Sequence, residues 1–354
     1  MFRDRGALWA VALDPQTQFG DAYAEGRIEV SGNLVALVEA VFRACDPERR
    51  SRPRRERVLQ QFRRPAANTL AGSRRNIHHH YDLGNDFYRL WLDDEMVYTC
   101  AYFADAETSL EEAQRAKMDH VCRKLRLGPG ERVVEAGCGW GSLALFMARR
   151  FGVTVRAFNI SGEQIAFARE RARAEGLSAA VEFVEDDYRN VAGRCDAFVS
   201  VGMLEHVGRE HYRDLGEVIH RTLAPTGRGL LHSIGRNRPC PLDGWTEKRI
   251  FPGAYPPTLR EMLEVLEPRG FSVLDVENLR LHYAKTLEHW LARYEANMAA
   301  VEERFDAAFV RAWRLYLAGS MASFTTGWLQ LFQVLFARPE DNRVPWTRAY
   351  LYET

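Results

Sequence analysis

Apolar and polar positions switch between two periods from residue 132 onward, and this pattern predicts alternating strands and helices. Short apolar runs typical of buried parallel strands recur at residues 133–134, 153–158, 181–184, 197–201 and 229–233. Segments with helical apolar spacing separate the first three runs, at residues 142–150 and 162–175. Strands and helices in this order build a parallel sheet with helices on both faces, so we expect an α/β fold with a doubly wound, Rossmann-like sheet.

The chain before this region predicts a smaller unit. Residues 27–31 alternate like a strand, and residues 34–42 have the spacing of an amphipathic helix. An arginine- and proline-rich segment follows, which is typical of a linker or an exposed arm. We therefore expect a small N-terminal α+β domain at residues 1–60, a basic linker at 61–75 and the large α/β domain at 76–354.

Two insertions and an aromatic C-terminal segment modify the alternation. The insertions cover residues 76–128 and 235–267, and we expect both over the carboxyl ends of the strands, where such sheets bind ligands. Near the C-terminus, four aromatic residues recur at intervals of four and predict one face of a helix: Phe324, Trp328, Phe332 and Phe336. Core packing is the ordinary role of such a stripe, and a wall for an apolar substrate is the alternative.

Residues 132–141 carry a glycine-rich turn from strand to helix that predicts a nucleoside cofactor site. Gly137, Gly139 and Gly141 remove the Cβ atoms that would keep a ligand from the backbone. Glu135 adds a carboxylate that suits a cationic amino-acid group. The spacing differs from the G-x-G-x-x-G of dinucleotide enzymes, and no Gly-Lys-Ser/Thr follows for a triphosphate. S-adenosylmethionine therefore fits best, and the alternative is the turn of some other doubly wound domain.

Composition narrows the class of protein further. The 354 residues are 46% apolar, yet no uninterrupted apolar stretch reaches about 18 residues, and no secretory leader follows the start. Six cysteines without a C-x-x-C pair predict neither a zinc site nor a disulfide scaffold, which favours a reducing cytosol. Adjacent histidines such as His78 to His80 rarely converge on one ion, so we expect no metal.

Charge is balanced overall but not locally. The chain has 48 basic and 48 acidic residues, whereas residues 49–75 hold ten arginines and one glutamate. Such a cluster can meet anionic lipid headgroups or nucleic-acid phosphates, or it can be a solvated linker. No Asn-Pro-Pro-Tyr type of base-flipping motif is present and the isoelectric point is near 7.2, so we expect no nucleic-acid partner.

Further motifs give the chain a family resemblance. They lie at residues 78–88, 96–103, 159–164, 202–208, 231–235, 248–253, 275–283 and 330–336. Together with the glycine loop they resemble the cyclopropane-fatty-acyl-phospholipid synthases and mycolic acid cyclopropane synthases, which are class I S-adenosylmethionine-dependent methyltransferases. The resemblance extends over about residues 76–340 in matching order and spacing, and more weakly over the small front domain, which it implies to be lipid-binding.

The resemblance implies a reaction. A methylene group passes from S-adenosylmethionine to the cis double bond of an unsaturated acyl chain in a membrane phospholipid, and a cyclopropane ring results. The alternative within the family is a C-methyltransferase that makes methyl- or methylene-branched chains. A carbocation forms on the acyl chain, so the site needs a nearby base and walls that tolerate positive charge, as aromatic faces do.

The resemblance also assigns residues. For the cofactor it implies Tyr81, Tyr98, Thr99, Glu135, Gly137, Gly139, Gln164 and Asp187, with Asn159 where many methyltransferases carry a ribose-binding acid. For a bound bicarbonate ion that acts as the base, it implies Cys100, Glu205, His232, Ile234 and Tyr283. A lipid carrier with a vestigial site is disfavoured, because Glu135, Glu205, His232 and Tyr283 are all intact. By resemblance we also expect a homodimer, cytoplasmic and peripherally bound to the inner face of the membrane, where residues 49–75 meet anionic lipid.

Overall fold

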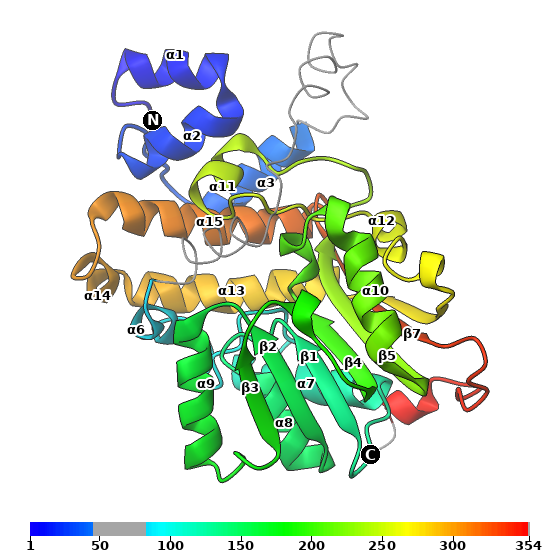
Figure 1. Ribbon diagram of the computed structural model, residues 1–354. Helices are drawn as coiled ribbons and strands as arrows, with labels where there is room; N and C mark the ends of the chain where they lie inside the picture. Colours follow the sequence, from blue (N-terminus) through cyan, green and yellow to red (C-terminus); the bar gives the residue numbers. More distant parts are fainter. Residues whose placement is uncertain (45–82, 353–354) are drawn as a thin grey trace.

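The computed structural model describes residues 1–44 and 83–352, which are built around one seven-stranded sheet (Figure 1). The strand order is β3-β2-β1-β4-β5-β7-β6. The strands are β1 (Arg132–Ala136), β2 (Thr154–Asn159), β3 (Val181–Glu185), β4 (Cys195–Val201), β5 (Leu223–Gly235), β6 (Ser272–Asn278) and β7 (Gln330–Ala337). Neighbours from β3 to β5 are parallel, whereas β7 is antiparallel to both β5 and β6. The expected doubly wound sheet is confirmed, with one antiparallel strand inserted near its edge.

Helices cover both faces of this sheet. Apolar side chains of α7 (Leu110–Lys124), α8 (Ser142–Phe151) and α9 (Gly162–Ala174) pack on one face. Those of α10 (Tyr212–Thr222) and α12 (Leu259–Leu263) pack on the other. The start of α7 is fixed by a capping box between Ser109 and Glu112, with acidic residues in its first turn and basic residues in its last. Local sequence thus fixes where α7 begins, and α7 carries Lys117, which lines the cavity described below.

A third layer of helices lies beside the sheet, across the middle of Figure 1, between the sheet and α1 and α2. It contains α13 (Arg280–Ala296), α14 (Met298–Glu302) and α15 (Ala307–Thr325), together with α6 (Asn85–Arg89) and α11 (Gly244–Arg249). A large aromatic cluster joins this layer to the sheet, and the cluster includes Trp140 from the loop that follows β1. The layer therefore sits over the carboxyl ends of the strands. Of the two insertions expected there, only the parts that form α6 and α11 belong to this layer, whereas α7 and α12 cover the faces of the sheet.

The N-terminal residues form helices packed on the third layer, and the strand expected at residues 27–31 is wrong. The helices are α1 (Arg5–Leu13), α2 (Pro15–Ala24) and α3 (Leu34–Ala44). Ile28 makes only an isolated bridge with Phe2. The guanidinium of Arg311, on α15, donates to the carbonyl oxygens of Tyr23 (2.6 Å) and Ile28 (2.7 Å), so a side chain takes an acceptor that a partner strand would use. The expected boundary near residue 60 and the basic linker lie outside the described residues.

The aromatic stripe near the C-terminus is divided between two elements, which corrects the expected helical face. Helix α15 ends at Thr325, and Phe332 and Phe336 lie on β7. A spacing of four keeps residues on one face of a helix, but it is also even, so it keeps them on one face of a strand. Phe332 and Phe336 are core residues beside α10, whereas Phe324 stacks on Tyr283 with ring centroids 4.6 Å apart.

The described part of the chain bears on three features: membrane-spanning helices, metal sites and disulfides. Within residues 1–44 and 83–352, no helix has both the length and the apolar character that a membrane crossing needs. Nor do these residues contain a group of three His, Cys, Asp or Glu side chains placed to hold a metal ion. Five cysteines lie in the same ranges, and all are free thiols. The histidines at 78–80 lie outside the described residues.

Candidate active site

The loop after β1 is shaped by glycines that no other residue could replace without strain. Gly137 has a φ of 87°, and a Cβ there would lie 2.9 Å from Cβ of Met203. Gly139 has a φ of 54°, and a Cβ there would meet nothing within 4 Å. The first glycine is thus required by packing, and the second leaves open space beside the backbone, as a ligand that approaches the main chain needs.

Seven of the eight residues expected to bind the cofactor line one cavity beside this loop. They are Tyr98, Thr99, Glu135, Gly137, Gly139, Gln164 and Asp187, while Tyr81 lies outside the described residues. The lining of the cavity includes residues that directly follow the carboxyl ends of β1, β2, β3 and β4. The structure therefore brings together residues spread over some 90 positions of sequence, and their contact with the cofactor stays a prediction.

Glu135 is a buried acid in the lining of this cavity. Its side chain is 2% exposed, and its Oε2 has no hydrogen-bond partner among the described residues. Burial raises the pKa of Glu135, and the nearby Lys117 ammonium opposes that rise. Lys117 is itself buried and donates from Nζ to Oγ1 of Thr99 at 2.9 Å. A buried carboxylate with one unsatisfied oxygen fits the cationic amino-acid end of S-adenosylmethionine.

The opposite end of the cavity is set by two side chains that hold each other. Nδ2 of Asn159 donates to Oε1 of Gln164 at 2.7 Å and to the carbonyl of Gly139 at 3.3 Å. Oδ1 of the buried Asp187 accepts from the N–H of Arg189 at 2.9 Å. Asn159 therefore anchors Gln164 to the glycine loop in the place where many methyltransferases carry a ribose-binding acid.

A second group of expected residues gathers at the ends of β4 and β5. Oε1 of Glu205 accepts from the N–H of Ile234 at 2.5 Å, and His232 lies two residues earlier on the same strand. Burial raises the pKa of Glu205 to about 7, against the hydrogen bonds from the main chain and Ser233. Burial lowers the pKa of His232 to about 3, with the charge of Lys117 adding to the effect. Near neutral pH, His232 is thus uncharged and Glu205 exchanges its proton readily.

Cys100 and Tyr283 are the remaining residues of this group. Tyr283 lies on α13, and Cys100 lies in the segment before α7. Sγ of Cys100 lies 3.1 Å from the carbonyl of Ala101 and 4.0 Å from that of Leu279, directly before α13. Burial raises the pKa of the Cys100 thiol, which keeps it protonated. Cys100 belongs to the large aromatic cluster, and Ile234 and Tyr283 pack against that cluster. Among the five expected anion-site residues, Glu205 and Ile234 are joined by a hydrogen bond, and the binding of one anion by all five stays a prediction.

Two of the expected anion-site side chains each have a buried polar atom without a partner among the described residues. The atoms are Oε2 of Glu205 and Nε2 of His232, whose side chains are 5% and 2% exposed. Unsatisfied buried polar atoms are rare in proteins and usually mark a place for a ligand, an ion or a water molecule. A bicarbonate ion carries both a hydroxyl donor and anionic acceptors, so its chemistry fits these two atoms.

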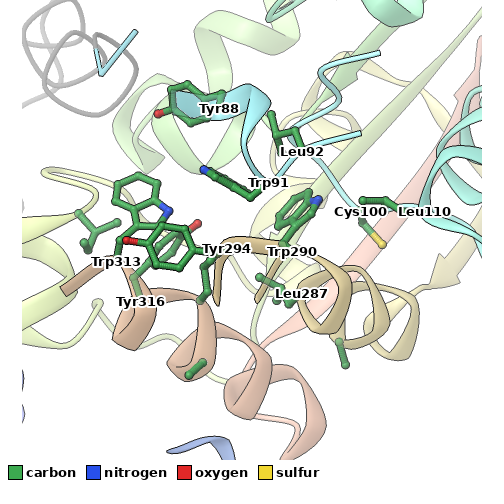
Figure 2. Close-up of a cluster of buried hydrophobic side chains, with 14 of the residues drawn as sticks. Tyr88, Trp91, Leu92, Cys100, Leu110, Leu287, Trp290, Tyr294, Trp313 and Tyr316 are labelled. Atoms are coloured by element: carbon green, nitrogen blue, oxygen red, sulfur yellow. The ribbon is translucent and has the colours of Figure 1, made fainter. Parts of the chain in front are cut away.

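A cluster of buried aromatic rings lies beside these residues, and it includes Trp91, Trp290 and Trp313 (Figure 2). Tyr98 lines the cofactor cavity, and its ring lies 5.2 Å from that of Trp91 and 5.3 Å from that of Trp290. The ring of Trp290 lies 5.9 Å from that of Tyr283. Figure 2 shows Trp290 and Cys100 on the same side of the cluster. Electron-rich ring faces therefore connect the cofactor cavity with the expected anion site.

Sequence reasoning missed three residues of this region. Lys117 and Trp140 line the cofactor cavity, and Gln333 contacts His232. Trp140 stands inside the glycine motif and could have been included. A lysine among the buried positions of α7, and a glutamine within the apolar run of β7, were the available signals for the other two.

We expect Glu135→Gln to weaken S-adenosylmethionine binding about 10- to 100-fold, because a hydrogen-bonded charge is worth roughly 1.5–3 kcal/mol. Isothermal titration calorimetry measures the change. Glu131→Gln is the matched control, since Glu131 lies at the opposite end of β1 and pairs with Arg228 at 2.6 Å. Equal affinities of Glu135→Gln and the unchanged protein would contradict the role of Glu135.

The position of this cavity at the carboxyl ends of a doubly wound sheet, with a buried carboxylate beside a glycine loop, defines an S-adenosylmethionine-dependent methyltransferase. Residues 69–334 match the family described as mycolic acid cyclopropane synthetase. The chain belongs to this family, as the sequence resemblance predicted.

Individual relatives agree with this assignment. The chain is 37% identical over 356 residues to the probable fatty acid methyltransferase of Pseudomonas putida, covering 95% of this chain and 86% of that protein. It is 40% identical over 264 residues to the cyclopropane-fatty-acyl-phospholipid synthase of Escherichia coli K12, covering 74% and 68%. The solved mycolic acid cyclopropane synthase CmaA1, complexed with SAH and CTAB, matches with a TM-score of 0.71 and 30% identity, covering 74% of this chain and 97% of that one.

Proposed function

We propose that the protein transfers a methylene group from S-adenosylmethionine to a cis double bond of an unsaturated fatty acyl chain in a phospholipid and closes a cyclopropane ring. Methyl transfer to fatty acyl chains is the coarser function that the relatives' names support. The observation that carries the finer proposal is the pair of unpartnered buried atoms, Oε2 of Glu205 and Nε2 of His232. A simple methyl transfer to a strong nucleophile would not need this second site.

The residues divide the work of the reaction. When bound, S-adenosylmethionine supplies an electrophilic methyl group, and an alkene needs such an electrophile held close because it is a weak nucleophile. Glu135 and the glycine loop orient the amino-acid end. The neighbouring rings of Tyr98 and Trp290 lie 5.3 Å apart, and cation–π attraction to such rings would stabilise positive charge that develops on the acyl chain. Water is excluded by the same aromatic cluster, which prevents capture of that cation.

Ring closure requires that the new methyl group lose a proton. Glu205, with its pKa raised by burial to about 7, can take or share that proton at neutral pH. A bicarbonate ion would supply a small base at this place, held by His232, Tyr283 and main-chain N–H groups. Fixed donors on several sides favour the anion over water.

An alternative product is a methyl- or methylene-branched acyl chain. The name of the Pseudomonas putida relative, a probable fatty acid methyltransferase, favours this second candidate. A ring, a methylated alkene and a methylene branch all add the same CH₂, so mass alone does not separate them. The intact second site favours ring closure, because a base that acts on the new methyl group leads to the ring.

The deciding experiment incubates the protein with labelled S-adenosylmethionine and vesicles of cis-unsaturated phospholipid. We expect label in the lipid and upfield ring hydrogens in its proton NMR spectrum. Vesicles of saturated phospholipid are the control and should stay unlabelled. Labelled lipid with olefinic or ordinary methyl signals would instead identify the branched-chain activity, and unlabelled lipid would refute both proposals.

We also propose that the protein works as a homodimer on the cytoplasmic membrane surface. The arginine cluster at 49–75, which we propose to meet anionic lipid, lies outside the described residues. Within them, α1 exposes Leu8 (46%), Trp9 (67%) and Leu13 (85%), and this apolar group suits the headgroup boundary of a bilayer.

Vesicle binding tests this contact. We expect the double variant Trp9→Ser, Leu13→Ser to lower the partition coefficient onto anionic vesicles about 10-fold or more, since each buried apolar side chain contributes roughly 1.5–3 kcal/mol. Co-sedimentation measures it. Trp346→Ser is the matched control, because Trp346 is fully exposed at 102% and distant in sequence from α1. Equal losses in both variants would contradict a role for α1, and high salt should weaken binding where arginines contribute.

A further inference from the structure

His232 and Gln333 face each other across the antiparallel strand pair β5 and β7. They are direct partners in the register of the two strands. Nδ1 of His232 lies 3.0 Å from Nε2 of Gln333, and the two side chains are 2% and 0% exposed. Their side chains lie on the α7 face of the sheet, because Leu230 and Leu335, two residues away on each strand, pack against α7 and α8. The contact is therefore part of the rigid sheet.

The chemistry of this contact fixes the proton on the ring. An amide nitrogen can only donate, so Nδ1 of His232 accepts, and a neutral imidazole then carries its single proton on Nε2. Nε2 is the ring atom that has no partner among the described residues. It is thus a buried N–H donor that calls for an acceptor.

We propose that Gln333 is a positioning residue that holds His232 in the tautomer protonated at Nε2, so that His232 donates a hydrogen bond to the anion beside Glu205. This inference rests on the proposed function, which places an anion there. With the opposite tautomer, Oε2 of Glu205 and Nε2 of His232 would both be acceptors when Glu205 is ionised, and neither would offer a donor to the anionic oxygens. The low pKa of His232, caused by burial, keeps the ring neutral and makes the choice of tautomer matter.

The arrangement has a cost that supports a functional origin. Oε1 of Gln333 is also buried and has no partner among the residues of 1–44 and 83–352. An unsatisfied buried acceptor destabilises a fold, and an apolar residue would pack here without that cost. A glutamine at this position is explained by what its amide does for His232.

The test reads the tautomer directly by 15N NMR on protein labelled with 15N-histidine. The His232 signals are identified by their loss in His232→Gln. We expect a protonated Nε2 and a bare Nδ1 in the unchanged protein. In Gln333→Glu the carboxylate can only accept, so the proton should move to Nδ1. Gln330→Glu is the matched control, since Gln330 lies on the other face of β7 and binds Asn278. A proton on Nδ1 in the unchanged protein would overturn the inference.

Kinetics give an independent readout. We expect Gln333→Glu to lower kcat about 10- to 100-fold and to raise the bicarbonate concentration needed for half-maximal activity, as loss of orienting partners does elsewhere. The affinity of Gln333→Glu for S-adenosylmethionine should equal that of the unchanged protein. The control variant Gln330→Glu should also keep this affinity. If the unchanged protein modifies no lipid, the proposed function fails while the tautomer remains measurable. A tautomer that is the same in Gln333→Glu and the unchanged protein refutes the role of Gln333 alone.

Discussion

Glu205→Gln should lower kcat by about 10²- to 10⁴-fold, the range that one general base contributes, while the affinity for S-adenosylmethionine changes less than about twofold. Glutamine keeps the oxygen that accepts from the N–H of Ile234, so the local fold survives. It loses the carboxylate that takes or shares a proton. Single-turnover kinetics and calorimetric titration of the cofactor measure the two quantities separately.

The pH profile sharpens this prediction. Because burial raises the pKa of Glu205 to about 7, kcat should rise as the pH rises through about 7, when the carboxyl ionises. This rise should be absent from Glu205→Gln. The control variant Glu131→Gln, at the distant amino end of β1, should keep the rise of kcat with pH. Parallel losses of kcat and cofactor affinity in Glu205→Gln would place this residue in the cofactor site instead.

Lys124→Met should lower the free energy of unfolding by about 3 kcal/mol, because it removes one member of a buried ion pair. Nζ of Lys124 lies 2.6 Å from Oε2 of Glu277 and 3.4 Å from Oδ2 of Asp275, and Lys124 is 1% exposed. These contacts tie α7 to β6 across the edge of the sheet. Urea denaturation followed by circular dichroism gives the change.

Acid pH should reduce the difference in free energy of unfolding between Lys124→Met and the unchanged protein. Burial alone would raise the pKa of Glu277, but hydrogen bonds and charge from His120 and Lys124 outweigh it and lower the pKa from its ordinary 4.5 to about 2. The stabilisation is therefore present above about pH 4.5 and lost as the pH falls towards 2. Lys285→Met is the control, since its partner Glu288 is an exposed neighbour on the same helix. A control loss as large as that of Lys124→Met would contradict the importance of burial.

The sequence predicted those parts of the fold whose signals are local. Apolar runs mark β1 to β5, because parallel strands are buried on both faces, and the apolar periodicity of α8 and α9 is equally local. The glycine loop was predictable for the same reason, since Glu135, Gly137 and Gly139 belong to one short motif, whereas the other expected cofactor residues came from family resemblance. The anion-site residues came from family resemblance, and the structure shows Glu205 and Ile234 in contact.

Features that depend on distant partners could not be predicted. The alternation at residues 27–31 is genuine, but Arg311, nearly 300 residues away, takes the carbonyl of Ile28. Phe332 and Phe336 have a spacing that fits both a helix and a strand. They lie on a strand because β7 pairs with β5 on one side and β6 on the other. Lys117 and Gln333 look like ordinary polar residues until the sheet places them beside Glu135 and His232.

The insertion of β7 between β5 and β6 determines when during synthesis the second site can be completed. His232 emerges on β5 about a hundred residues before its partner Gln333. Until residues 330–337 are available, β5 is an unpaired edge strand that can join other chains. A nascent chain can thus assemble the cofactor loop early, whereas the contact between His232 and Gln333 forms only after residues 330–337 have been made. Loss of the C-terminal strand, even with every expected catalytic residue present, should leave a protein prone to aggregation.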